Sequence, residues 1–217
     1  MITKTMRGLA AAALTILPLL GASPSQAAEV VSLTDAVQQL PLAAESRAGY
    51  QRTSFKHWVD ADKDSCSTRA EVLLDESRIP ATVEAGCKVV AGEWFSYYDG
   101  VTVTTPGGLD IDHMVPLAEA WDSGASQWTA AEREAYANDL GSERSLVAVT
   151  AKTNRSKADQ DPSTWLPPAA DARCTYAADW VATKLRWNLT ADQSEVKALT
   201  NIAESCGSLA VQYEPAD

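Results

Sequence analysis

The segment Leu109-Asp110-Ile111-Asp112-His113-Met114-Val115-Pro116 decides the architecture that we expect for this chain. Its apolar, β-favouring residues predict a strand that carries a carboxylate next to an imidazole and stops at a proline. Successive side chains of a strand point to opposite faces, so Asp112 and His113 can serve one site only where the strand ends or bends. The chain has only two histidines, so imidazole chemistry must use His113 or His57.

The first 27 residues have the pattern of a secretory signal peptide. Lys4 and Arg7 form a basic start, residues 8–22 are apolar, and Ser25-Gln26-Ala27 resembles a cleavage site. The apolar run is shorter than the roughly 20 residues that a transmembrane helix needs. We therefore expect an exported, extracellular protein without a membrane segment and a single mature domain over residues 28–217.

Acidic residues outnumber basic ones. The formal net charge is −11 for the full chain and becomes −13 when Lys4 and Arg7 are removed. Proteins that only bind nucleic acid usually have a surplus of Lys and Arg, because counterion release supplies much of their affinity. The composition therefore argues against a passive nucleic-acid-binding protein, but not against an enzyme that releases its substrate.

The four cysteines favour two disulfides. Cys66, Cys87, Cys174 and Cys206 are an even number in a chain that we expect to be exported. No C-x-x-C spacing is present, so the sequence does not indicate a zinc knuckle. Three pairings are open, and we favour Cys66–Cys87 with Cys174–Cys206 because each pair brackets one local unit.

A calcium-loop pattern precedes the central strand. Position six of the loop, normally glycine, is Ser65, and the segment allows two interpretations: a structural Ca²⁺ site, or a solvated acidic turn before a helix at residues 68–76. Four carboxylates occupy positions one, three, five and twelve of the pattern: Asp60, Asp62, Asp64 and Glu71.

The remaining sequence predicts short helices and few strands. Residues 88–98 and 101–105, joined through Asp99-Gly100, predict a β-hairpin, and residues 145–150 predict a further strand. Helices are expected at residues 32–48 with a break at Pro41, at 117–121, from Thr129 to Leu140, at 151–158, at 172–187, and at 191–206 with Thr190 as the cap.

A set of short motifs follows in a fixed order over roughly residues 86–168: Asp112-His113-Met114-Val115-Pro116, Leu117-Ala118-Glu119-Ala120-Trp121, Ser123-Gly124-Ala125, Leu146-Val147-Ala148-Val149, Asn154-Arg155-Ser156-Lys157, Asp161-Pro162 and Trp165-Leu166-Pro167-Pro168. This set resembles the HNH endonucleases, above all a secreted bacterial HNH family that shares its nuclease domain with GmrSD-type restriction enzymes. The resemblance implies an α+β fold: a ββα-metal finger at about residues 109–158, embedded in a mostly helical domain with a small antiparallel sheet and two disulfides.

The resemblance and the chemistry of phosphodiester cleavage assign the same central roles. His113 is expected to be the general base, since neutral imidazole accepts a proton from water near neutral pH. Asp112 and Asn154 offer hard oxygen ligands for one Mg²⁺ or Mn²⁺ ion. The candidates for phosphate binding are Arg69, Arg155 and Lys157.

Further residues are expected to support this site. HNH motifs often have a central His or Asn before the second strand, but here that position is Ser145, while Asn138 lies several residues earlier. Either side chain could brace the loop. Glu119, one helical turn beyond Pro116, is a third supporting candidate, and His57 is expected to be structural.

We expect a secreted, metal-dependent, largely non-specific endonuclease. Its substrate would be DNA, with RNA as a further one, its products would carry 5′-phosphate and 3′-hydroxyl ends, and the protein would be a monomer. The alternative function is an acidic extracellular calcium-binding module without catalysis. A serine hydrolase or zinc metalloprotease is not favoured, because the chain lacks Gly-x-Ser-x-Gly and His-Glu-x-x-His.

Overall fold

The described chain contains seven α-helices and eight short strands, and five of the strands follow one another without an α-helix between them. The computed structural model describes residues 28–216, so the predicted signal peptide and its cleavage site lie outside the described residues. The helices are α1 (Leu33–Gln39), α2 (Thr68–Asp75), α3 (Leu117–Asp122), α4 (Ala130–Ala137), α5 (Ala151–Lys157), α6 (Arg173–Arg186) and α7 (Gln193–Ser205). Within residues 28–216 we find no helix whose length and apolar character would carry it across a bilayer.

The strands pair two by two. They are β1 (Glu29–Ser32), β2 (Thr82–Glu84), β3 (Lys88–Ala91), β4 (Trp94–Ser96), β5 (Val101–Val103), β6 (Leu109–His113), β7 (Leu146–Thr150) and β8 (Ala210–Tyr213). The antiparallel pairs are β1–β8, β2–β3, β4–β5 and β6–β7. The predicted α+β class with small antiparallel sheets is confirmed.

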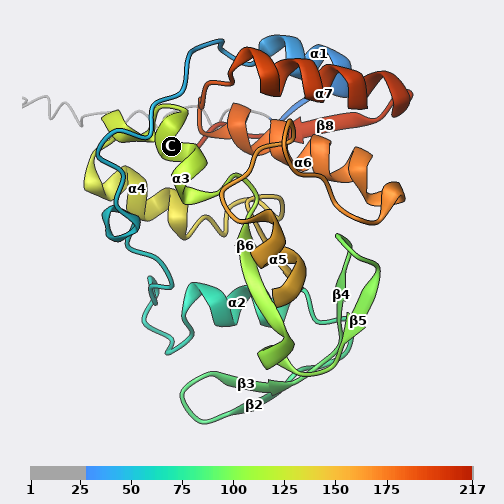
Figure 1. Ribbon diagram of the computed structural model, residues 1–217. Helices are drawn as coiled ribbons and strands as arrows, with labels where there is room; N and C mark the ends of the chain where they lie inside the picture. Colours follow the sequence, from blue (N-terminus) through green and yellow to red (C-terminus); the bar gives the residue numbers. More distant parts are fainter. Residues whose placement is uncertain (1–27, 217) are drawn as a thin grey trace, which may run out of the picture.

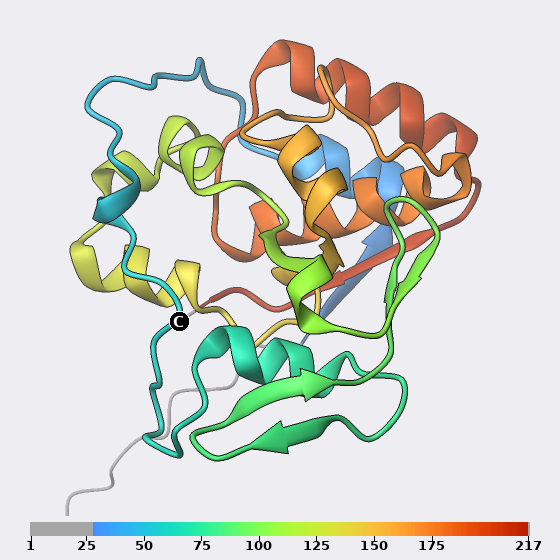
Figure 2. The same ribbon diagram turned by 60° about the horizontal axis from the view of Figure 1, so that its bottom comes forward.

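The predicted central strand joins two groups of elements. Figure 1 shows α1, α6 and α7 with β8 at one end of the molecule and the hairpins β2–β3 and β4–β5 at the other, with β6 and α5 between them. Figure 2 shows α2 alongside the β2–β3 hairpin. Leu109 and Ile111 belong to a smaller core around Trp94, whereas Met114 and Val115 belong to the larger core. One short segment therefore contributes to both cores.

Strand β6 also separates apolar from acidic side chains. It pairs with β7 in a register that sets Ile111 opposite Ala148 and Asp112 opposite Val147. Leu109 and Ile111 pack in the smaller core, while Asp110 and Asp112 bind side chains of α5. This alternation is the period of two expected for a strand, and it directs the carboxylates towards the helix that follows β7.

Both favoured disulfides are confirmed. Cys66–Cys87 ties the segment before α2 to the β2–β3 turn, and Cys174–Cys206 joins the start of α6 to the end of α7. Each bridge closes a local loop.

Residues 88–98 form two strands rather than the single one predicted. β3 pairs with β2, and β4 pairs with β5 through the expected turn at Asp99-Gly100. The break falls at Gly92, where an added Cβ would lie 2.5 Å from the Trp94 ring. The backbone can follow this path around the buried indole because Gly92 has no side chain.

Three predicted helix boundaries are wrong, and one sheet is missing from the prediction. α1 ends at Gln39, before the expected break at Pro41, and residues 43–48 are not helical although the helix was expected to reach residue 48. α4 ends at Ala137 instead of Leu140, with Asn138 as its C-cap. Asp192, not Thr190, caps α7, because its side chain accepts the N–H of Glu195 at 2.8 Å. The sheet β1–β8 was not predicted, since nothing local marks a pairing between opposite ends of the described chain.

A buried lysine holds three helices together. The ammonium of Lys184, on α6, donates to Glu119 of α3 at 2.9 Å and to Glu195 of α7 at 2.6 Å. The Ser123 hydroxyl and the Thr190 carbonyl lie 3.0 and 2.8 Å from the same nitrogen, so the three ammonium protons are shared among four acceptors. Burial alone would lower the pKa of Lys184, but Glu195 and Glu119 outweigh it and raise the pKa above its ordinary value.

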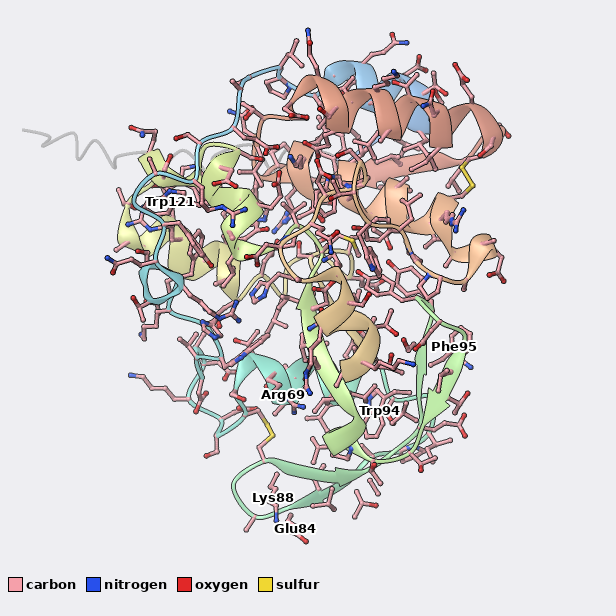
Figure 3. The ribbon with its side chains drawn as sticks, in the orientation of Figure 1. Arg69, Glu84, Lys88, Trp94, Phe95 and Trp121 are labelled. Atoms are coloured by element: carbon pink, nitrogen blue, oxygen red, sulfur yellow. A yellow bond between two sulfur atoms is a disulfide. The ribbon has the colours of Figure 1, made fainter. Side chains whose placement is uncertain are left out.

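We predict that Lys184→Met lowers the free energy of unfolding by about 3 to 5 kcal/mol, because it leaves two buried carboxylates without their cation. Urea denaturation measures the change. The control is Lys88→Met, which removes the exposed ion pair to Glu84 (Figure 3) and should cost less than about 1 kcal/mol. Equal losses in the two variants would contradict the prediction.

Glu76 predicts a pH dependence of stability. Both its oxygens accept the Ala148 N–H at 3.0 Å, on the edge of β7 that does not pair with β6. Burial raises the pKa of Glu76 from 4.5 to about 7, although this hydrogen bond opposes the shift. Because the folded-state pKa lies above the unfolded one, stability is lost as the pH rises through this interval.

The difference in free energy of unfolding between Glu76→Gln and the parent should therefore shift in favour of the variant by about 2 kcal/mol when the pH is raised from 5 to 8. Chemical denaturation at both pH values measures this difference. Glu204→Gln, which changes an exposed carboxyl on α7, should show no such trend. A gain that is independent of pH would show that ionisation of Glu76 is not its cause.

Candidate functional site

The predicted site residues converge where β6 ends. A cleft of about 320 Å³ opens there, between the end of β6, Pro116 and α5. Larger hollows exist elsewhere, but this one gathers the carboxylate, imidazole and amide groups that were expected to act together. Its lining residues are Arg52, Ile111, Asp112, His113, Pro116, Asn154, Arg155, Ala158 and Asp159.

Asp112 is buried and held by two donors. The Lys157 ammonium lies 2.6 Å from Oδ2, and the Tyr98 hydroxyl donates to the same oxygen at 2.7 Å. Burial raises the pKa of Asp112, while the charge and hydrogen bond of Lys157 oppose that shift. Burial likewise lowers the pKa of Lys157, and Asp112 opposes it. Each partner therefore offsets the cost of burying the other's charge.

Lys157 was expected to face the cleft, but it does not. Its side chain has no exposed surface, and its ammonium also donates to the carbonyls of His113 and Met114 at 2.9 Å each. A phosphate outside the protein cannot reach it in this arrangement. The phosphate-binding role predicted for Lys157 is therefore corrected to a contact with β6.

Arg69 also contacts the backbone beside β6. Its guanidinium donates to the carbonyls of Pro106 and Leu109 at 3.3 and 3.1 Å, and Figure 3 shows it between α2 and β6. Arg155 is exposed and lines the cleft, 3.4 Å from Asp110. Arg52 also lines the cleft, from a part of the chain far from the central motif. Nothing local links residue 52 to that motif, so its place in the site could not be predicted from the sequence.

The imidazole of His113 is buried with a defined tautomer. Its Nε2 lies 3.0 Å from the Ala137 carbonyl, which can only accept, so Nε2 carries the proton and Nδ1 keeps its lone pair. The ring stacks on Trp58, with centroids 5.3 Å apart, and lies 6.4 Å from Tyr136. Burial lowers the pKa of His113 from 6.5 to about 3, so the ring is neutral at neutral pH.

His57 and Trp58 belong to a neighbouring loop. His57 Nδ1 binds the Phe55 carbonyl at 2.9 Å, and its ring centroid lies 6.3 Å from that of His113. Trp58 has a φ of 61°, a left-handed conformation that costs energy for a bulky residue. The structure holds this strained residue against the face of the imidazole.

Asn138 braces that loop. Its Oδ1 accepts the Val59 N–H at 3.0 Å and the Thr68 hydroxyl at 2.8 Å. Its Nδ2 donates to the carbonyls of Lys56 and Glu134 at 2.8 and 2.7 Å. All four hydrogen-bonding positions of the amide are therefore filled, and the loop segment on either side of Trp58 is tied to α4.

The side chains of the other two supporting candidates bind groups outside the loop at Trp58. Ser145 donates to Asp139 at 2.6 Å, and its carbonyl accepts the Met114 N–H at 3.0 Å. Glu119 binds Lys184 and Ser123 and so belongs to the helix network described above. Of the three candidates, Asn138 is the one whose amide holds the loop that packs on His113.

Asp112 and Asn154 offer oxygen atoms on the same cleft. Among residues 28–216, the side-chain amide of Asn154 makes one long contact, 3.5 Å from Nδ2 to Asp110, and no described residue fixes it elsewhere. The donors of Asp112 both bind Oδ2, which leaves Oδ1 for a further partner. A carboxylate and an amide oxygen are suited to Mg²⁺ or Mn²⁺, and the residues present fit such an ion.

The calcium-loop carboxylates lie together on an exposed loop, outside the cleft. Asp60, Asp62 and Asp64 each have an oxygen within 4.8 Å of the others, and Asp64 is similarly close to Glu71. Ser65, at the position where glycine is usual, has a φ of 83°. Burial raises the pKa of Glu71, and the three aspartates add to the shift.

The cleft lies inside a segment that matches a known family. A family model described as GmrSD restriction endonucleases, C-terminal domain, matches residues 50–202. The chain is 41% identical over 158 residues to an uncharacterized secreted protein of Arthroderma benhamiae, a match that spans 73% of this chain and 76% of that one. No solved structure gives a significant match. The chain therefore belongs to the family of GmrSD restriction endonuclease C-terminal domains.

Proposed function

We propose that the protein is a secreted, metal-dependent endonuclease that hydrolyses DNA, and also RNA, with little sequence preference. The observation that carries this proposal is the neutral imidazole of His113, with Nδ1 unprotonated, in one cleft with Asp112 and Asn154. The antiparallel pair β6–β7 followed by α5 supports a ββα-metal finger of the HNH type. The two disulfides and the secreted relative support an extracellular location.

His113 acts on the attacking water. Nδ1 accepts a proton as the water oxygen forms a bond to phosphorus, and the bond from phosphorus to the 3′ oxygen breaks. The leaving oxygen gains a proton from solvent, which gives 3′-hydroxyl and 5′-phosphate ends. The hydrogen bond to Ala137 and the stacked Trp58 ring hold the imidazole in one orientation during this transfer.

Polar side chains of the cleft hold the substrate. Asp112 and Asn154 would hold one Mg²⁺ or Mn²⁺ ion, which when bound supplies positive charge for the phosphoryl and leaving oxygens. Arg52 and Arg155 lie on the cleft lining and can donate to phosphate oxygens of the backbone. These contacts involve phosphates rather than bases, which accounts for the low sequence preference.

We predict that His113→Ala lowers the rate of plasmid cleavage by about 10²- to 10⁴-fold, because it removes the general base. Asp112→Asn and Asn154→Ala should instead weaken metal binding, so part of their lost activity should return at high Mn²⁺. His113→Ala should not recover in this way. A gel assay over a metal titration separates the two classes.

The matched control is His57→Ala, which removes the other histidine and should keep most of the activity. Circular dichroism checks that each variant folds, and end-labelling should find 5′-phosphates on the products. Activity of His113→Ala within a few fold of the parent, or 2′,3′-cyclic phosphate ends on RNA, would overturn the mechanism.

The alternative function, a calcium-binding module without catalysis, is favoured by the three clustered aspartates. It requires that plasmid DNA remain intact with every divalent ion. A structural Ca²⁺ ion at the loop is compatible with both functions.

If the loop binds Ca²⁺, saturating Ca²⁺ should raise the melting temperature, by mass action on the folded state. Asp62→Asn should abolish the rise, whereas Asp35→Asn on α1 should leave it unchanged; equal melting curves in calcium and chelator would exclude the ion.

A further inference from the structure

We infer that Lys157 and Tyr98 are positioning residues that orient Asp112 for metal binding and fix its spacing from Asn154. The inference rests on the proposed function, which makes Asp112 and Asn154 the metal ligands. Neither Lys157 nor Tyr98 would touch the ion or the substrate. Both would act through the carboxylate of Asp112.

The hydrogen bonds of Lys157 are saturated. Its three ammonium protons match three acceptors at 2.6, 2.9 and 2.9 Å: Asp112 Oδ2, the His113 carbonyl and the Met114 carbonyl. These acceptors belong to consecutive residues at the end of β6. A phosphate contact would require breaking one of these bonds inside the protein. The geometry therefore assigns Lys157 to the backbone and carboxylate at the end of β6.

Tyr98, in the turn between β4 and β5, binds the same carboxylate. It follows β4, is fully buried, and donates to Asp112 Oδ2 at 2.7 Å. Its ring packs edge-on against Tyr97, Trp165 and Tyr176, with centroids 4.8 to 5.5 Å apart, so it has no room to move aside. With two donors on Oδ2, the carboxylate cannot rotate freely, and Oδ1 is the atom left for the cleft.

Lys157 also links the two metal ligands. Asn154 and Lys157 are three residues apart on α5, a spacing that places both side chains on one face of a helix. That face lies on β6, since Asn154 approaches Asp110 and Lys157 binds Asp112. Anchoring Lys157 therefore fixes the distance between the Asn154 amide and the Asp112 carboxylate. Residues that orient metal ligands in this way typically contribute tenfold to a hundredfold in metal affinity.

The test is Mn²⁺ binding without nucleic acid, measured by titration with electron paramagnetic resonance on the full folded protein. Parent and variants all carry Asp62→Asn, so that the carboxylates of the acidic loop do not contribute a second Mn²⁺ site. Lys157→Met and Tyr98→Phe should each weaken Mn²⁺ affinity by about tenfold or more. Lys152→Met, the same substitution at an exposed lysine of α5, should leave it unchanged. If Lys157→Met does not fold, Tyr98→Phe decides, because it removes one hydroxyl and keeps the ring.

A second measurement separates this role from phosphate binding. The affinity for a DNA duplex in a metal-free buffer with chelator should be the same for Tyr98→Phe and the parent. Parent-like Mn²⁺ binding by Lys157→Met or Tyr98→Phe would overturn the inference while leaving the proposed function intact. Failure of the parent protein to bind Mn²⁺, or Mn²⁺ binding that survives Asp112→Asn, would overturn the proposed function and this inference with it.

Discussion

The ion pair between Lys157 and Asp112 is the interaction on which the rest of the cleft depends. Burying either charge without its partner would destabilise the fold, because desolvation costs several kcal/mol for each ion. Paired, they attach α5 to the end of β6 at the point where the strand turns towards Pro116. The imidazole, the amide and the carboxylate of the cleft all belong to these two elements. Their relative positions thus follow from one buried contact.

Lys184 forms a second buried ion-pair network, in the helical part of the molecule. There the cation joins α3, α6 and α7 through Glu119 and Glu195. Buried networks of this kind contribute little net stability compared with apolar side chains of similar size, but removing one member is costly. Each sheet that the described residues form has two strands, so this fold gains from contacts that require one specific partner. Two buried lysines therefore fix how the elements meet, while the apolar cores supply the burial.

Local sequence was sufficient for the fold class, for both disulfides and for the meeting of Asp112, His113, Asn154 and Arg155 in one cleft. It failed where a role depends on distant partners. Lys157 looks like a surface cation in a polar helix, and only the three-dimensional packing buries it. Arg52 is a lone arginine without periodicity, so no pattern could connect it with the site. Asn138 serves the loop near Trp58 through hydrogen bonds across 70 to 82 residues, a separation that no spacing rule describes.

The pairing of β1 with β8 has a consequence for how the chain folds. Glu29 and Tyr213 are 184 residues apart, yet the Tyr213 hydroxyl donates to the Glu29 carboxylate at 2.8 Å. During synthesis, β1 emerges long before its partner strand exists, and closing so large a loop carries an entropic penalty that only prior compaction can reduce. This sheet must therefore form late, after the helices between its strands have packed. Until then the backbone of β1 is unpaired, so a chaperone that binds it would protect the nascent chain from aggregation.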